Sequence, residues 1–80
     1  MTVTVRLFAF YAEQIGRSEF SLELPDGSTV RDAVHSIAQL PGAAVLPARP
    51  LAAVNCEYAA PDLVMSEGDE LALIPPVAGG

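Results

Sequence analysis

The sequence predicts a small α+β domain in which a mixed sheet of four or five strands carries one main helix on one face. Two patterns support this prediction. Residues 2–8 and 17–24 alternate apolar and polar side chains, as half-buried strands do. Residues 29–38 instead repeat apolar side chains at the spacing of an α-helix. One amphipathic helix and one sheet bury their apolar sides best against each other, which gives two layers.

The first part of the chain is expected to form two strands joined by a short helix. In residues 2–8 the odd-numbered side chains are apolar and are expected in the core, which leaves Phe8 beside Arg6 on the exposed side. Residues 9–16 suit one or two helical turns closed by their final glycine. The strand over residues 17–24 should then run antiparallel to the first, because the connection is short.

The main helix is expected to begin after Thr29. Thr29 and Asp32 have the spacing of a capping box, with aspartate in place of the usual glutamate. The helix should end before Pro41. The apolar stripe that should face the sheet consists of Val30, Ala33, Val34, Ile37 and Ala38.

The second part of the chain is expected to contain a loop and several short strands. The loop covers residues 42–50 and allows one helical turn at 43–46. The expected strands are residues 51–55, a return leg that opens at Tyr58, and residues 70–75, with turns at 55–57, 61–62 and 66–69. In the last strand Leu71 and Leu73 should point to the core and Ile74 to the other side.

The first and last strands are the most apolar, so we expect them to be neighbours at the centre of the sheet. That pairing would place Phe8 and Ile74 side by side on the face opposite the helix, with Tyr58 nearby. An apolar patch rimmed by charge is typical of a partner surface. The alternative is that a loop or the second hairpin covers these side chains.

Residues 1–74 are therefore interpreted as one domain, and residues 75–80 as an extended, flexible tail. Pro75 and Pro76 cannot continue a central strand, because they lack the backbone N–H. Gly79 and Gly80 have no Cβ, so the end of the tail is narrow. Short ends that contain glycine can also simply fray.

The composition limits the kinds of partner. The net charge is −6, with four arginines and no lysine. An acidic surface disfavours nucleic acid and anionic membranes and favours a partner with a basic face. The sequence contains neither an apolar stretch of about 20 residues nor a signal-peptide layout, so a cytoplasmic location is expected. Without lysine the chain offers no ε-amine for an isopeptide bond.

No group of residues suggests that the chain is an enzyme by itself. His35 is the only histidine and falls on the polar side of the helix. Cys56, the only cysteine, is expected in a turn with no basic neighbour to activate its thiol. The acidic residues 67–70 lack the spacing of a calcium loop. We therefore expect no metal site and no bound cofactor, and the α-carboxylate of Gly80 is the one distinctive reactive group.

The whole chain resembles the small subunit of molybdopterin synthase, a ubiquitin-like β-grasp sulfur carrier. The resemblance rests on residues 5–9, 13–16, 53–55 and 68–80. A Gly-Gly ending alone is also found in ubiquitin-like modifiers and in the thiamine-pathway carrier. The ending Pro-Pro-Val-x-Gly-Gly, preceded by Gly-Asp-Glu, is a much more specific pattern than Gly-Gly alone. Cys56 and the absence of lysine depart from the family pattern, but neither touches the tail.

The resemblance implies that the chain is a non-catalytic sulfur donor. A partner adenylyltransferase would use ATP to convert the carboxylate of Gly80 to an acyl-adenylate, and a sulfur donor protein would displace AMP to leave a thiocarboxylate. Gly79 would let the tail lie flat in a tight channel. In the large subunit the sulfur would attack cyclic pyranopterin monophosphate (precursor Z) to form molybdopterin, in molybdenum cofactor biosynthesis.

The resemblance also implies a docking surface and an assembly. A heterotetramer with a central dimer of large subunits would carry one small subunit at each end. The interface residues of this chain would be Phe8, Tyr58, Ile74, Pro75, Pro76 and Val77. Two alternatives stay open: a protein modifier conjugated to target lysines through Gly80, and a β-grasp interaction domain with an inert tail.

Overall fold

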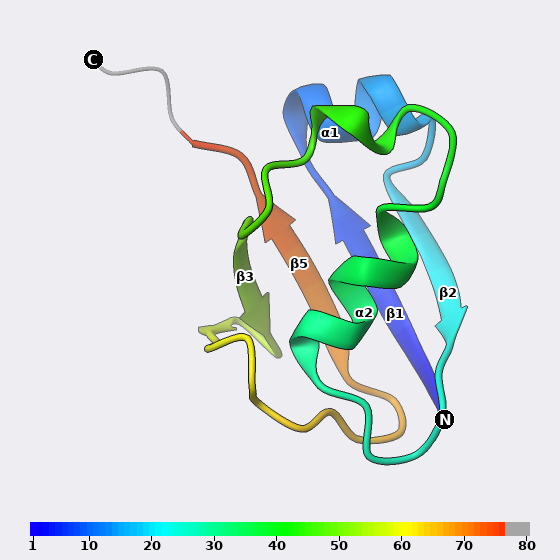
Figure 1. Cartoon of the computed structure of the whole chain (residues 1–80), viewed down its shortest axis with the longest axis vertical. Helices are drawn as coiled ribbons and strands as arrows, with labels where there is room; N and C mark the ends of the chain where they lie inside the picture. Colours follow the sequence, from blue (N-terminus) through cyan, green and yellow to red (C-terminus); the bar gives the residue numbers. More distant parts are fainter. Residues whose placement is uncertain (77–80) are drawn as a thin grey trace.

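A mixed sheet of five strands forms one layer of the domain, and helix α2 packs across one of its faces (Figure 1). The computed structural model describes residues 1–76. The strands are β1 (Thr2–Leu7), β2 (Glu19–Glu23), β3 (Leu51–Val54), β4 (Glu57–Tyr58) and β5 (Glu70–Ile74). The helices are α1 (Ala9–Ile15), α2 (Val30–Ile37) and the 3-10 turn η1 (Ala43–Val45). The predicted two-layer α+β architecture is confirmed.

The first and last strands pair at the centre of the sheet. The strand order is β2-β1-β5-β3-β4; β1 and β5 are parallel, and the other pairs are antiparallel. Val5 lies opposite Leu71, and Leu7 lies opposite Leu73. All four side chains are at most 2% exposed. The prediction that these two strands are neighbours is therefore confirmed, and their side chains form the centre of the core.

Helix α2 starts at the predicted capping box. The backbone N–H of Thr29 donates to the carboxylate of Asp32 at 2.9 Å, and the N–H of Asp32 donates to the hydroxyl of Thr29 at 3.3 Å. The hydrogen bond from the Thr29 backbone, and after it the interaction with the Thr29 side chain, hold the pKa of the Asp32 carboxyl below its ordinary value. Val30, Ala33 and Ile37 are buried against the sheet. The last residue of the predicted stripe, Ala38, is exposed because the helix has already ended at Ile37.

Helix α1 and turn η1 lie at the same end of the sheet, beyond the ends of β1 and β5 (Figure 1). Tyr11 of α1 is only 1% exposed and belongs to the core, which the sequence did not predict. Gly16 ends α1 in the left-handed conformation, as expected. The backbone at Gly42 approaches α1 so closely that a Cβ there would lie 1.9 Å from the carbonyl oxygen of Gln14.

The turn between β3 and β4 has only two residues. Asn55 and Cys56 both have positive φ, 50° and 72°, which is the conformation of a type I′ hairpin turn. The amide of Asn55 donates to the carboxylate of Asp69 at 2.9 Å and accepts from the backbone N–H of Glu70 at 3.0 Å. The predicted tight turn is confirmed, and its asparagine ties the hairpin to the turn before β5.

Replacing Gly42 tests the contact between η1 and α1. Gly42→Ala should lower the free energy of unfolding by about 3 kcal/mol or more, because it adds a backbone clash to an unfavourable φ of 87°. Gly16→Ala is the matched control, since its φ is 84° and nothing lies within 4 Å of the added Cβ. It should cost only about 1–2 kcal/mol. If urea denaturation shows the same loss of unfolding free energy in Gly42→Ala and Gly16→Ala, the close approach of Gly42 to α1 adds nothing to the cost of the substitution.

Candidate functional site: the open sheet face beside the tail

The sheet face turned away from α2 carries a row of side chains across all five strands. Residues that pair in adjacent strands lie on the same face of a sheet. The row that lies on this open face consists of Glu19, Arg6, Ala72, Ala53 and Tyr58, from β2 to β4. Leu51 pairs with Ile74 on the same face, closer to the end of β5. The open face is thus charged on the β2 side and apolar on the β3 and β4 side.

We define the open-face patch as Phe8, Leu51, Tyr58 and Ile74. Phe8 is 42% exposed, Leu51 is 50% exposed and Tyr58 is 76% exposed, while Ile74 is half-buried. None of these side chains belongs to the buried core. Large apolar side chains that gather on a surface beside charged groups are typical of sites that bind other proteins.

Arg6 forms the charged border of the patch. Its guanidinium carbon lies 5.8 Å from the centre of the Phe8 ring, so Phe8 is found beside Arg6, as predicted. The Arg6 side chain also lies 3.7 Å from a carboxylate oxygen of Glu19 and 3.9 Å from one of Glu70. Exposed ion pairs of this kind add little to stability. Their effect is to hold a guanidinium at the edge of an apolar surface.

The patch borders the root of the tail. The chain leaves the sheet after Ile74, at the same edge where β1 ends (Figure 1). Pro75 is half-buried and Pro76 is exposed, and neither belongs to the strand. Val77, Gly79 and Gly80, which the sequence assigned to the interface or to the chemistry, lie outside the described residues.

Leu51 is a patch residue that sequence reasoning missed. It is the first residue of β3, and it joins the patch only because it pairs with Ile74, which lies 23 positions later in the chain. An exposed leucine at the start of a strand was the one available signal. The register of β3 against β5 was needed to interpret it.

The other titratable candidates do not come together. His35 is an exposed residue of α2, and Cys56 is exposed in the turn between β3 and β4. Among residues 1–76 no group of three histidine, cysteine or acidic side chains could hold a metal ion. Over the same residues no helix combines the length and the apolar character needed to cross a membrane.

A sheet whose first and last strands are parallel central neighbours, crossed by one helix, is the β-grasp fold of ubiquitin-like proteins. The model of the ThiS family matches residues 5–80. The chain belongs to the ThiS family.

Named relatives match along almost the whole chain. The molybdopterin synthase sulfur carrier subunit of Chlamydomonas reinhardtii is 35% identical over 83 residues, covering 100% of both chains. The subunit of the same name in Arabidopsis thaliana is 32% identical over 79 residues, covering 98% of this chain and 82% of the relative. Among solved structures, SAMP1 of Haloferax volcanii, a small archaeal modifier protein, is 30% identical with a TM-score of 0.87 and full coverage of both chains.

If the patch serves binding, it should contribute little to folding. Tyr58→Thr keeps a β-forming residue and should change the free energy of unfolding by less than about 1 kcal/mol. Leu73→Ala, in the neighbouring core, should lower it by about 2–5 kcal/mol. Urea denaturation of both variants measures the difference. A loss at Tyr58 as large as the loss at Leu73 would mean that the ring is part of the folded core.

Proposed function

We propose that this chain is the sulfur-carrier subunit of a molybdopterin synthase and that it carries sulfur on Gly80. The observation that carries the proposal is the full-length match to two relatives of that name, at 32% and 35% identity. The position of the open-face patch supports it, because a carrier must dock while its tail reaches into another protein.

The proposed cycle begins with activation of the tail by a partner adenylyltransferase. A carboxylate oxygen of Gly80 attacks the α-phosphorus of ATP, and pyrophosphate leaves. A sulfur donor protein then supplies sulfur at the hydrosulfide level. The carbon–sulfur bond forms as the bond to AMP breaks, which leaves a thiocarboxylate. Because glycine has no Cβ, the acyl carbon of Gly80 is open to this attack.

The proposed transfer takes place in the large subunit of the synthase. The thiocarboxylate sulfur bonds to a carbon of the pterin precursor, and water then cleaves the bond between the sulfur and the acyl carbon, which leaves the sulfur on the precursor and restores the Gly80 carboxylate. A second sulfurated carrier repeats the transfer and completes the dithiolene of molybdopterin. The six residues from Pro75 to Gly80 can span at most about 20 Å, enough to enter a buried pocket. Pro75 and Pro76 reduce the conformational entropy lost when the tail threads into it. This chain supplies the sulfur and leaves catalysis to its partner.

The open-face patch is proposed to dock on the large subunit. Phe8, Leu51 and Tyr58 would bury their exposed rings and methyl groups there, and Ile74 would hold the tail root against the partner. The net charge of −6 suits a partner whose pocket must hold an anionic substrate and an anionic tail, and which is therefore basic. We further propose a heterotetramer in which two large subunits form the centre.

A second candidate function is conjugation to other proteins. The similarity to SAMP1 favours it, because that protein is a small archaeal modifier. The acyl-adenylate would be shared, but an amine would then displace AMP and form an amide bond to Gly80. The chain has no lysine, so copies of it could not be linked to each other through side chains. Higher-mass conjugates in cell lysate that disappear when Gly80 is deleted would support this function.

Two variants separate docking from chemistry in a mixture of carrier, large subunit, adenylyltransferase, sulfur donor, ATP and precursor. Deleting Gly80 should reduce formation of molybdopterin to background, while binding to the large subunit and thermal stability stay nearly unchanged. Phe8→Asp should weaken binding to the large subunit at least about tenfold, because it places a charge in an apolar interface. It should leave adenylation of Gly80 intact.

Three results would contradict the proposal. Unchanged product formation after deletion of Gly80 would identify an inert tail. Unchanged affinity of Phe8→Asp would remove Phe8 from the interface. A large loss of thermal stability in the Gly80 deletion would assign the tail to the fold instead of to the chemistry.

A further inference from the structure

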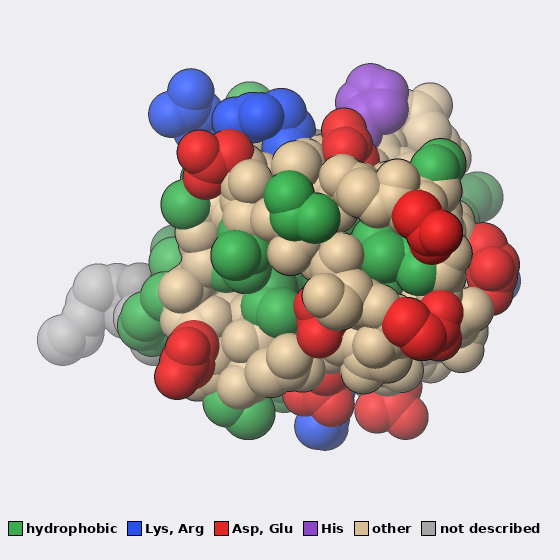
Figure 2. Space-filling view, turned by 90° about the horizontal axis from the view of Figure 1, so that it is seen from below, with side chains coloured by type: hydrophobic (Ala, Val, Ile, Leu, Met, Phe, Trp, Pro, Cys, Tyr) green, Lys and Arg blue, Asp and Glu red, His purple; other side chains and the backbone are tan. Residues whose placement is uncertain are grey.

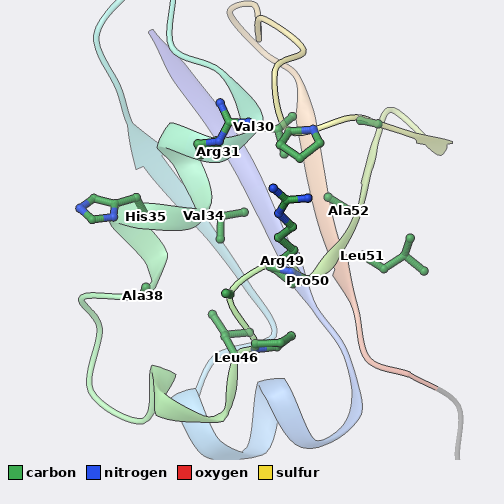
Figure 3. A pocket seen from close by; sticks show the side chains of 14 residues that line it. Val30, Arg31, Val34, His35, Ala38, Leu46, Arg49, Pro50, Leu51 and Ala52 are labelled. Atoms are coloured by element: carbon green, nitrogen blue, oxygen red, sulfur yellow. The ribbon is translucent and has the colours of Figure 1, made fainter.

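A groove on the helix side of the sheet forms a second surface of the domain. It lies between α2 and the segment that leads into β3, and its volume is about 700 Å³ (Figure 3). Its lining is largely apolar and includes Val30 and Val34 of α2, Leu46 after η1, and Ala52 of β3. Leu51 of the open-face patch also belongs to the lining of this groove. The side chain of Ala52 is on the face opposite that of Leu51, so most of the groove lies on the side of the sheet away from Phe8, Tyr58 and Ile74.

Two of the four arginines of this acidic chain line the groove. In Figure 3 the guanidinium of Arg49 lies between Val34 of α2 and Ala52 of β3, on the side of the groove where Arg31 is found. His35 also belongs to the lining, but its ring points away from the groove in this view. Figure 2 shows arginine side chains and the histidine along one edge of the molecule with carboxylates beside them, and further carboxylates are spread over the rest of the view.

Neither of these two arginines forms an ion pair within the part of the chain that the structure describes. The ion pairs found among residues 1–76 involve Arg6 and the N-terminus, and none involves Arg31 or Arg49. The carboxylate next to Arg31 in the sequence, that of Asp32, accepts a hydrogen bond from the backbone N–H of Thr29 instead. Two guanidinium groups beside an apolar groove therefore remain available to carboxylates of another molecule.

We propose that this groove binds a short peptide segment of a partner protein in which acidic residues flank apolar side chains. The apolar side chains would cover Val34, Leu46 and Ala52, and the carboxylates would pair with Arg31 and Arg49. This site goes beyond the proposed function, because it shares only Leu51 with the open-face patch and otherwise lies on the other side of the sheet. A partner bound in the groove would leave Phe8, Tyr58, Ile74 and the tail root free.

The composition of the groove favours a peptide over two other occupants. A small anion would gain little from the apolar floor, and both arginines are exposed, so they do not form an enclosed anion site. A second copy of this chain would bring another net charge of −6, and the two copies would repel each other. A short acidic segment on an otherwise neutral or basic protein meets the local positive charge without that cost.

The test is a titration of the full-length ¹⁵N-labelled chain with the acetylated, amidated peptide Asp-Glu-Val-Ile-Leu-Asp-Glu, followed by NMR. We expect amide shift changes concentrated at Val34, Ala48 and Ala52. Arg49→Glu and Arg31→Glu should each weaken binding about tenfold, since each replaces an attraction by a repulsion. Arg17→Glu makes the same change of charge outside the groove and should weaken binding less than about twofold. A peptide with Asn and Gln in place of Asp and Glu should bind at least about tenfold more weakly.

Several outcomes would overturn the proposal. The first is the absence of amide shift changes, and the second is a set of changes scattered over the whole surface. The third is an equal loss of peptide affinity in Arg17→Glu and Arg49→Glu. Sodium phosphate that shifts the same amides with equal affinity would identify a small-anion site. Shifts of these amides that depend on the concentration of the chain alone would identify self-association. Backbone spectra of each variant without peptide establish that its fold is unchanged. Arg31→Glu and Arg49→Glu test the site independently, because Arg31 belongs to α2 and Arg49 to the segment before β3.

Discussion

The parallel pairing of β1 with β5 is the contact on which the rest of the structure depends. It brings the two most distant strands of the chain together and buries four side chains, Val5, Leu7, Leu71 and Leu73, against α2. Because parallel strands end at the same edge of a sheet, β1 and β5 deliver Phe8 and Ile74 to one place. The chain continues from that place into Pro75. The central hydrophobic pairing therefore also positions the apolar surface beside the tail.

Much of this fold follows from local sequence patterns. The alternation in β1 and β2, the Thr29 capping box and the tight turn at Asn55 each depend on residues that are close together in the sequence, so they could be predicted. The central place of β1 and β5 could be predicted as well, because these strands are the most apolar.

The features that were missed all depend on contacts between distant segments. Tyr11 is buried although its short helix has no clear apolar stripe, because turn η1 packs against that helix. Leu51 joins the patch only through the register of β3 against β5. Arg49 lies beside α2 because the loop before β3 runs along that helix (Figure 3). Periodicity describes one element at a time, and it carries no information about which loop covers which helix.

The two surfaces differ in chemistry as well as position. The open-face patch combines exposed apolar side chains with a border of carboxylates and one arginine. The groove beside α2 combines an apolar floor with arginines that have no ion-pair partner among residues 1–76. In the proposed cycle the chain would be activated by one protein, loaded by a second and emptied by a third, and it would benefit from surfaces that different partners recognise separately. On an 80-residue domain, the opposite sides of a single sheet can supply them.

Whether Gly80 carries sulfur can be measured by mass spectrometry of the chain purified from the cells that naturally express it. Cleavage after Glu70 releases the peptide Leu71–Gly80, which contains no methionine and no cysteine. Oxidation of a sulfur-containing side chain therefore cannot imitate the expected change in this peptide. We expect a fraction of the peptide in which one oxygen of the Gly80 carboxylate is replaced by sulfur. A peptide found only with an unmodified carboxylate, from cells that are actively making molybdopterin, would contradict it.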